Sequence, residues 1–198
     1  MRAWMVRLAL ATLLIATAGA MADDKAGTVA LFNGKDLEGW EGHSQLWSVQ
    51  DGVIVGKNTE PVKVSTYLVT KRHFRDFLLN ARVKLVNGGT RKDGKPMEMH
   101  SGIAVWGRLA PEKGDKYTYA GHLVMFPSGY GFYDLYGRAM IHQNNDKAAK
   151  VNKQHDWNHI EILAQGNRIR VAVNGALISD CREPLPQPGG EVGGAVGV

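Results

Sequence analysis

Cysteine is almost absent from this sequence, in which Cys181 is the single one among 198 residues. One thiol cannot form a disulfide framework, and it excludes a zinc site built from four cysteines. No histidine and asparagine motif accompanies Cys181, so we do not expect it to act as a nucleophile. A composition of 44% hydrophobic and 22% charged side chains excludes intrinsic disorder and supplies one ordinary core, or two small ones. Stability must therefore come from packing.

The sequence also lacks clusters of charge of one sign. Its 24 lysines and arginines are spread among 19 aspartates and glutamates, and the formal net charge is +5. A nucleic-acid-binding protein usually gathers its basic residues on one face or along one segment. The charge therefore identifies no partner, and we expect no nucleic acid to bind.

Long hydrophobic runs are missing too, apart from one short run near the N-terminus. Two arginines precede the apolar residues 8–16, and an A-x-A sequence follows at residues 20–22. This order is typical of a secretory signal peptide, and the run is shorter than the roughly 20 residues that span a bilayer. We therefore expect cleavage of residues 1–22, which leaves residues 23–198 as a periplasmic or secreted domain without stable membrane insertion. Loss of the two arginines would lower the formal charge from +5 to +3.

From Thr28 onward, short apolar or alternating runs are separated by turn residues. Asp51 with Gly52, and Asn174 with Gly175, favour tight hairpins because these residue types accept positive backbone angles. No run has the period of a long amphipathic helix. The pattern predicts an all-β fold, an antiparallel two-sheet jelly-roll sandwich in a single domain with little helix. The expected strands cover residues 46–49, 53–55, 66–70, 77–85, 101–106, 122–126, 131–136, 159–163, 168–173 and 176–178.

Common catalytic and nucleotide-binding motifs are absent. The sequence has no G-x-S-x-G elbow, no Walker loop and no G-x-G-x-x-G sequence that opens a helix, so nucleotide binding is not expected. His155 and His159 have the spacing of a helical zinc site, but they lead into an alternating strand. Residues four apart in a strand lie about 13 Å from each other, which is too far for the two to share one metal by themselves.

Three long polar segments interrupt the strands, at residues 87–97, 110–118 and 144–154. The first two flank the strand that ends in Trp106. We interpret all three as loops at one rim of the sandwich. Loops on a rigid scaffold usually carry specificity, although solvated connectors would have the same composition.

Polar and aromatic residues concentrate between positions 100 and 142. The candidate site residues are His100, Trp106, His122, Asp134, Tyr136, Arg138 and His142. Four aromatic residues offer flat apolar faces with a polar edge, which suits a sugar ring, namely Trp106, Tyr130, Tyr133 and Tyr136. Aromatic filling of a sandwich core explains them equally well. A carboxylate cannot lie unpaired in an apolar core, so the face that carries Asp134 should be wet or lined with hydrogen-bond partners.

Several segments resemble the 3-keto-disaccharide hydrolase family, which was formerly a domain of unknown function. They are residues 31–40 (LFNGKDLEGW), 47–56 (WSVQDGVIVG), 101–103 (SGI), 136–137 (YG), 157–158 (WN) and 166–175 (GNRIRVAVNG). In this order they span essentially the whole chain after the expected signal peptide. The resemblance implies a concanavalin-like jelly roll, export to the periplasm or surface, and cleavage of the glycosidic bond of 3-keto-glycosides.

The chemistry that such a substrate requires is well defined. A ketone at C3 acidifies the hydrogen on C2, so a base can remove it to give an enolate that expels the substituent at C1. Water then adds across the new double bond. A site for this reaction needs a base near C2, donors or a cation near the C3 oxygen, and an acid near the leaving oxygen. It does not need the two carboxylates of an ordinary glycosidase.

The sequence departs from the family pattern at two positions. Leu123 stands where many relatives carry glutamate, and Trp106 stands where relatives often carry arginine. Either another group supplies the base, or the domain is a lectin-like module that binds carbohydrate without cleaving it. The fold by itself would also suit adhesion or scaffolding.

For cleavage, the predicted catalytic residues are His122 or His100 as base, with Asp134 orienting an imidazole or holding a cation. The predicted substrate-binding residues are Arg138 and His142, which would polarise oxygens, and Trp106 and Tyr136, which would stack on the sugar. The sequence requires no cofactor and leaves a divalent metal ion open, and it does not indicate an oligomeric state. Residues 193–198 resemble the start of a strand after which relatives continue, so we expect the C-terminus to be truncated.

Replacing His100, His122 and Asp134 singly by alanine should slow cleavage of a 3-keto-glucoside in at least one variant, by the 10² to 10⁴-fold that a general base typically contributes. The rate of product release measures this directly. Full activity in all three variants would discard the assignment.

Overall fold

The computed structural model describes residues 6–9, 27–58, 62–86, 101–126, 130–135 and 139–182, with the backbone alone for residues 6–9 and 139. The strands are β1 (Val6–Ala9), β2 (Trp40–Glu41), β3 (Trp47–Gln50), β4 (Val53–Gly56), β5 (Val69–Thr70), β6 (Phe77–Leu85), β7 (Ser101–Leu109), β8 (Tyr119–Phe126), β9 (Phe132–Asp134), β10 (Ala139–His142), β11 (Asn158–Gln165), β12 (Arg168–Val173) and β13 (Ala176–Arg182). The helices are the short 3-10 helix η1 (Pro111–Lys113) and α1 (Asn145–Val151).

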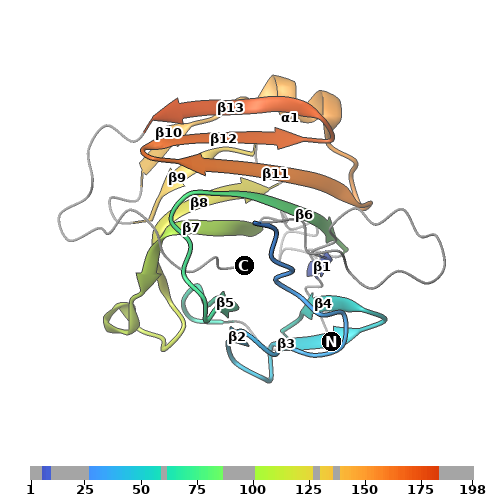
Figure 1. Ribbon diagram of the computed structural model, residues 1–198, viewed down its shortest axis with the longest axis vertical. Helices are drawn as coiled ribbons and strands as arrows, with labels where there is room; N and C mark the ends of the chain where they lie inside the picture. The colour runs from blue at the N-terminus through green and yellow to red at the C-terminus, as the bar shows by residue number, and fades with distance from the viewer. Residues whose placement is uncertain are drawn as a thin grey trace, which may run out of the picture.

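Two antiparallel sheets pack face to face (Figure 1). Sheet A has the strand order β13-β12-β11-β6-β1-β4-β3, and sheet B has the order β10-β9-β8-β7. Strands β2 and β5 pair as a separate ribbon. This arrangement confirms the predicted all-β jelly-roll sandwich. Within the described residues, no helix has the length and hydropathy that crossing a bilayer would require.

Strand β1 comes from the expected signal peptide and lies inside sheet A. It pairs antiparallel with β4 on one side and with β6 on the other. Cleavage after Ala22 would remove β1, and the facing edges of β4 and β6 would then need another strand or water to satisfy their backbone groups. Cleavage of residues 1–22 stays a prediction.

The turn residues and the alternation placed most strands correctly. Asp51 and Gly52 both have positive φ angles, of 50° and 70°, as the tight turn between β3 and β4 requires. The expected ranges 77–85 and 168–173 coincide with β6 and β12. Helix α1 lies in the segment that we interpreted as a polar loop, and the Asn144 side chain caps it by accepting a hydrogen bond from the backbone N–H of Lys147 at 3.1 Å.

The segment that opens the family resemblance has a structural role. Asn33 Oδ1 accepts hydrogen bonds from the backbone N–H groups of Lys35 at 2.8 Å and Asp36 at 3.0 Å. The indole N–H of Trp40 donates to the carbonyl oxygen of Leu31 at 2.6 Å, and Trp40 is buried. These contacts fold residues 31–40 into a compact turn, which gives both Asn33 and Trp40 a structural role.

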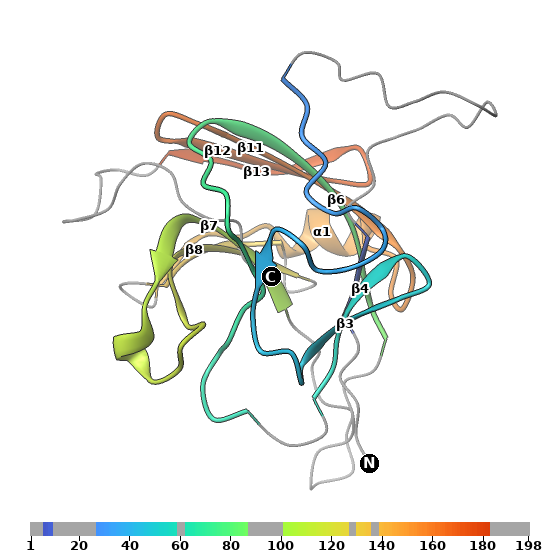
Figure 2. The same ribbon diagram turned by 60° about the horizontal axis from the view of Figure 1, so that its bottom comes forward.

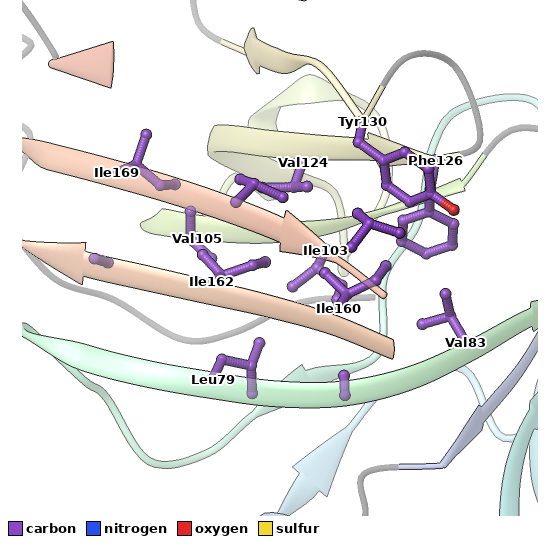
Figure 3. Packing of buried hydrophobic residues seen from close by; sticks show 14 of the residues in the cluster. Leu79, Val83, Ile103, Val105, Val124, Phe126, Tyr130, Ile160, Ile162 and Ile169 are labelled. Atoms are coloured by element: carbon purple, nitrogen blue, oxygen red, sulfur yellow. The ribbon is translucent and has the colours of Figure 1, made fainter. Parts of the chain in front are cut away.

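The main core lies between the sheets. Figure 3 shows Ile103, Val105 and Val124 of sheet B near Ile160 and Ile162 of sheet A. All five side chains are fully buried, and full burial of one such side chain stabilises the fold by about 1.5–3 kcal/mol. Because side chains alternate along a strand, the residues between these five point away from the core.

A β-bulge interrupts this alternation in β7. Val105 pairs with His122 and Arg108 pairs with Ala120, so β7 carries one residue more than β8 over this stretch. Trp106 has a φ of 52°, which is unusual for a bulky residue, and its side chain enters the core. At Gly107 the backbones of β7 and β8 meet, and a Cβ there would collide with the Ala120 carbonyl oxygen.

Gly107→Ala should therefore destabilise the fold by about 1–3 kcal/mol, because backbone rather than a flexible side chain must move. Chemical unfolding measures the loss. Arg108→Ala is the matched control: its ion pair with Glu112 is exposed, so we expect a change below about 1 kcal/mol. Equal stability of the two variants would contradict the close approach at Gly107.

Candidate functional site

The two faces of sheet B have different surroundings. The inner face carries Val105, Val124 and Phe132, which belong to the main core. The outer face carries a second apolar cluster, in which Ala104, Tyr119 and Leu135 are buried together with Tyr67 and Val69 from the neighbouring segment. The register explains this division. Ala104 pairs with Leu123, and Leu123 pairs with Tyr133. Each of the three is one position away from a residue of the inner face, so all three side chains lie on the outer face.

We call the outer surface formed by Tyr67, Tyr119, Leu123, Tyr133 and Leu135 the tyrosine face. The Tyr67 and Tyr119 rings lie 5.7 Å apart and are buried, whereas Leu123 and Tyr133 are half-buried. Tyr133 therefore offers an accessible ring on an otherwise apolar surface. A half-buried aromatic ring with one accessible side suits the C–H face of a sugar.

His122, a predicted base, lies on the inner face. Its side chain is 3% exposed, its ring stacks on Phe132 with centroids 4.9 Å apart, and the Trp106 ring meets it edge-on at 6.1 Å. Asp134 is its cross-strand neighbour in β9 and is half-buried. The fold thus brings three predicted residues together, His122, Asp134 and Trp106, on the core side of sheet B. Their catalytic and binding roles stay predictions.

Two of the aromatic residues that we considered for sugar stacking fill the core instead. Trp106 packs against Phe132, and its indole nitrogen is buried without a hydrogen-bond partner in the described part of the chain. Tyr130 is buried, and its hydroxyl donates to Asn152 Oδ1 at 2.6 Å. Burial raises the pKa of Tyr130 to about 12, so the hydroxyl stays neutral. Of these aromatic residues, Tyr133 lies on the tyrosine face.

His142 has a hydrogen-bond partner in the other sheet. Its Nδ1 is 3.0 Å from Ser179 Oγ, and Ser179 in turn donates to the Tyr130 carbonyl oxygen at 3.4 Å. This contact joins β10, at the edge of sheet B, to β13, at the edge of sheet A. The predicted residues His100, Tyr136 and Arg138 lie outside the described residues.

A histidine and an aspartate that the sequence analysis did not single out form a pair beside the tyrosine face. His43 Nε2 lies 2.7 Å from Asp115 Oδ2. Asp115 Oδ1 accepts hydrogen bonds from Thr66 Oγ1 at 2.8 Å and from the backbone N–H of Tyr117 at 2.9 Å. The Tyr117 ring meets the His43 ring edge-on at 4.8 Å.

The pair lies where two loops meet. Asp115 belongs to the loop between β7 and β8, which runs beside the segment before β5 in both views (Figures 1 and 2). The backbone N–H of Tyr67 donates to the Tyr117 carbonyl oxygen at 3.0 Å, and Thr118 Oγ1 donates to the Ser65 carbonyl oxygen at 3.2 Å. The polar composition of residues 110–118 was the signal for this site in the sequence, but nothing in the sequence pointed to His43, 72 residues before Asp115.

The hydrogen bonds around Asp115 favour its ionised form. Partial burial tends to raise the pKa of Asp115, but hydrogen bonds from Tyr117, His43 and Thr66 outweigh it and lower the pKa below its ordinary value. The Lys116 ammonium lies 4.9 Å from the centroid of the Tyr117 ring, and its hydrogen bond to Tyr117 raises the pKa of Lys116. The Asp115 carboxylate thus contacts the imidazole directly, and the Lys116 ammonium lies over the neighbouring Tyr117 ring.

A separate hollow of about 420 Å³ lies against sheet A. Its lining includes residues 27–31 and the side chains of Phe74, Asp76 and Arg72, whose guanidinium lies 5.3 Å from the centroid of the Phe74 ring. An aromatic ring with a few polar groups also suits a sugar. The predicted site residues do not line this hollow.

Among the residues that the structure describes, no three side chains of histidine, cysteine, aspartate or glutamate lie close enough together to hold a metal ion. His155 has a φ of 58° in a turn and His159 lies in β11, an arrangement that differs from the helical geometry of a two-histidine zinc site.

Comparison with known proteins identifies the family. Residues 27–194 match the family described as the 3-keto-alpha-glucoside-1,2-lyase-like domain. The chain belongs to this family. The match confirms the resemblance that the sequence motifs indicated. No protein of curated function matches the chain.

Solved structures share the fold of this family member. Two are candidate glycosyl hydrolases from Parabacteroides distasonis ATCC 8503: one is 22% identical with a TM-score of 0.57 and covers 84% of each chain. The other is 19% identical with a TM-score of 0.54 and covers 82% of this chain and 86% of its own. The carbohydrate-binding module CBM66 from Bacillus subtilis is 14% identical with a TM-score of 0.52, and covers 80% of this chain and 85% of its own.

Asp115→Asn should lower stability by about 1 kcal/mol at pH 7, because a partly buried carboxylate loses charge-assisted hydrogen bonds. The folded state lowers the pKa of Asp115, so its ionised form stabilises the fold above the ordinary value of 3.8. This contribution is lost as the pH falls from 3.8 through the lowered pKa.

Urea unfolding at pH 7 and at pH 3 tests the sign. The stability difference between the wild type and Asp115→Asn should shrink at pH 3, whereas Asp51→Asn, in an exposed hairpin turn, should show a small difference at both values. A difference that grows toward low pH would contradict the assignment.

Proposed function

We propose that this protein binds a 3-keto-glycoside on the tyrosine face and cleaves its glycosidic bond. Membership of a lyase-like family over residues 27–194 supports action on an oxidised sugar. The observation that carries the location is the arrangement of sheet B. Its inner residues are used by the core, while Tyr133 and Leu123 remain half-buried on the outer face, next to the loop that carries Asp115.

The tyrosine face is made of aromatic and aliphatic side chains, which suit sugar binding but carry no charged group for catalysis. A sugar ring laid on Tyr133 would cover apolar C–H groups with an aromatic ring and leave its hydroxyls toward the surrounding loops. Leu123, at the position where many relatives carry glutamate, extends this apolar surface. The groups that carry out proton transfer must therefore come from beside the face rather than from its centre.

The reaction proceeds in balanced steps. A base takes the proton from C2, and the electron pair of that C–H bond forms the C2=C3 double bond of an enolate. The enolate then re-forms the ketone as the C1–O bond breaks, and the leaving alcohol takes up a proton. Water adds to the resulting enone at C1, so the net change is hydrolysis to an alcohol and a free 3-keto sugar. For this step the sequence predicts His100 or His122 as base, Asp134 as its partner, and Arg138 and His142 near the oxygens. His122 and Asp134 lie on the inner face of sheet B, across the sheet from Tyr133, and these roles stay predictions.

A second function, binding without cleavage, has its own support. The apolar Leu123 removes a carboxylate from the tyrosine face, and a carbohydrate-binding module shares the fold. In that case a 3-keto-glycoside or an ordinary oligosaccharide would bind and leave unchanged. Product formation separates the two functions.

Purified protein should release nitrophenol from p-nitrophenyl 3-keto-α-glucoside and not from the unoxidised glucoside, because elimination needs the ketone. Tyr133→Ala should raise KM about tenfold, which matches a loss of roughly 1–1.5 kcal/mol of aromatic contact. Tyr133→Phe, which keeps the ring, should stay within about twofold of the wild type. Parallel assays with and without a chelator test the open question of a divalent metal ion.

Release from neither substrate, together with measurable binding of the intact glycoside, would establish the binding function instead. An unchanged KM in Tyr133→Ala would move the site away from the tyrosine face.

A further inference from the structure

We infer that His43 is a catalytic residue, the general base that removes the C2 proton, and that Asp115 is the positioning residue that orients it. The inference rests on the proposed function and deepens it by assigning the proton transfer to this pair. Its observations are independent of the family resemblance, which did not include either residue.

The hydrogen bonds fix the imidazole from one side. Asp115 is held by Thr66 Oγ1 and by the backbone N–H of Tyr117, both on Oδ1, which leaves Oδ2 for His43 Nε2 at 2.7 Å. The side chains of His43 and Asp115 are 26% and 23% exposed. A quarter-exposed imidazole is accessible to a ligand, yet its contact with a fixed carboxylate removes most of its rotational freedom.

The same bonds fix the tautomer. An ionised carboxylate only accepts hydrogen bonds, so Nε2 of His43 must carry the hydrogen that the short contact with Asp115 requires. In the neutral form of the imidazole, which is the form that a general base requires, Nδ1 then has the lone pair. It makes no hydrogen bond to any residue in the part of the chain that the structure describes. A neutral imidazole with a carboxylate behind one nitrogen and a lone pair on the other is the arrangement of a general base.

The surroundings connect this base to the tyrosine face, on which the sugar would lie. Tyr117, which meets the His43 ring edge-on, is bonded through its backbone to Tyr67 of the tyrosine face. Lys116 carries its ammonium group over the Tyr117 ring. A cation on the residue next to Asp115 is suited to the negative charge that develops on the C3 oxygen when the C2 proton leaves.

The step assigned to the pair is balanced. The Nδ1 lone pair of His43 takes the C2 proton, and the C–H electrons pass into the enolate. The imidazolium that forms is stabilised by Asp115, which stays ionised. As the C1–O bond breaks, the leaving oxygen takes a proton from the imidazolium or from water, and the neutral imidazole is restored.

The pair could have a purely structural role, and variants can separate that role from a catalytic one. His43 and Asp115 also fasten residues 110–118 to the segment around residue 43, so their loss could act through the fold alone. Three variants separate the two roles. His43→Asn keeps an N–H donor for Asp115 but has no base, His43→Ala leaves space for an added imidazole, and His159→Asn is the control, since His159 is half-buried on β11 of the other sheet.

The experiment measures kcat and KM on p-nitrophenyl 3-keto-α-glucoside, with thermal unfolding of each variant. We expect His43→Asn to lose about 10² to 10⁴-fold in kcat with KM within a fewfold of the wild type, and imidazole to restore part of the activity of His43→Ala. Asp115→Asn should lose less kcat than His43→Asn, and Asp115→Glu should recover part of that loss. His159→Asn should match the wild type.

The possible failures are distinguishable. If the wild type releases no nitrophenol, the proposed function fails, and the base assignment fails with it. If the wild type is active and His43→Asn retains its kcat, the assignment to His43 is wrong and the proposed function stands. If His43→Ala is folded, inactive and not rescued by imidazole, or if the variants lose activity only in step with their stability, the pair is structural and the inference is overturned.

Discussion

The alternation of side chains in β7, β8 and β9 is the constraint on which the rest of this molecule depends. Every second residue of these strands must enter the core against β6, β11 and β12, and Val105, Val124 and Phe132 fill those positions. The residues between them are thereby presented on the outer face. A shift of one residue in register would exchange the two sets, so the core and the tyrosine face are specified together. The bulge at Trp106 and Gly107 is a local departure within β7, and it directs a large ring inward.

This constraint also determines what each residue of sheet B can do. His122 shares the inner face with Val105 and Val124, so its ring packs among aromatic side chains. Leu123, one position later, faces outward and adds apolar surface to the tyrosine face. The outer face is therefore suited to binding a sugar, and the polar chemistry lies at its border, where loops bring His43, Asp115 and Thr66 together.

The sequence predicted those features that depend on neighbours along the chain. The alternation located β6 and β12, and residues with easy positive φ angles located the hairpins at Asp51 and Asn174. It did not predict α1, because one side-chain cap at Asn144 suffices for a two-turn helix that has no long apolar stripe. The pair of His43 and Asp115 joins two loops whose approach is set by the whole sheet, and no local pattern encodes such a contact.

The most direct test of the account is a crystal structure of the protein soaked with a 3-keto-glucoside. The account predicts a sugar ring laid on Tyr133, with C2 directed toward Nδ1 of His43. A sugar in the hollow beside Arg72 and Phe74, with the tyrosine face empty, would contradict it.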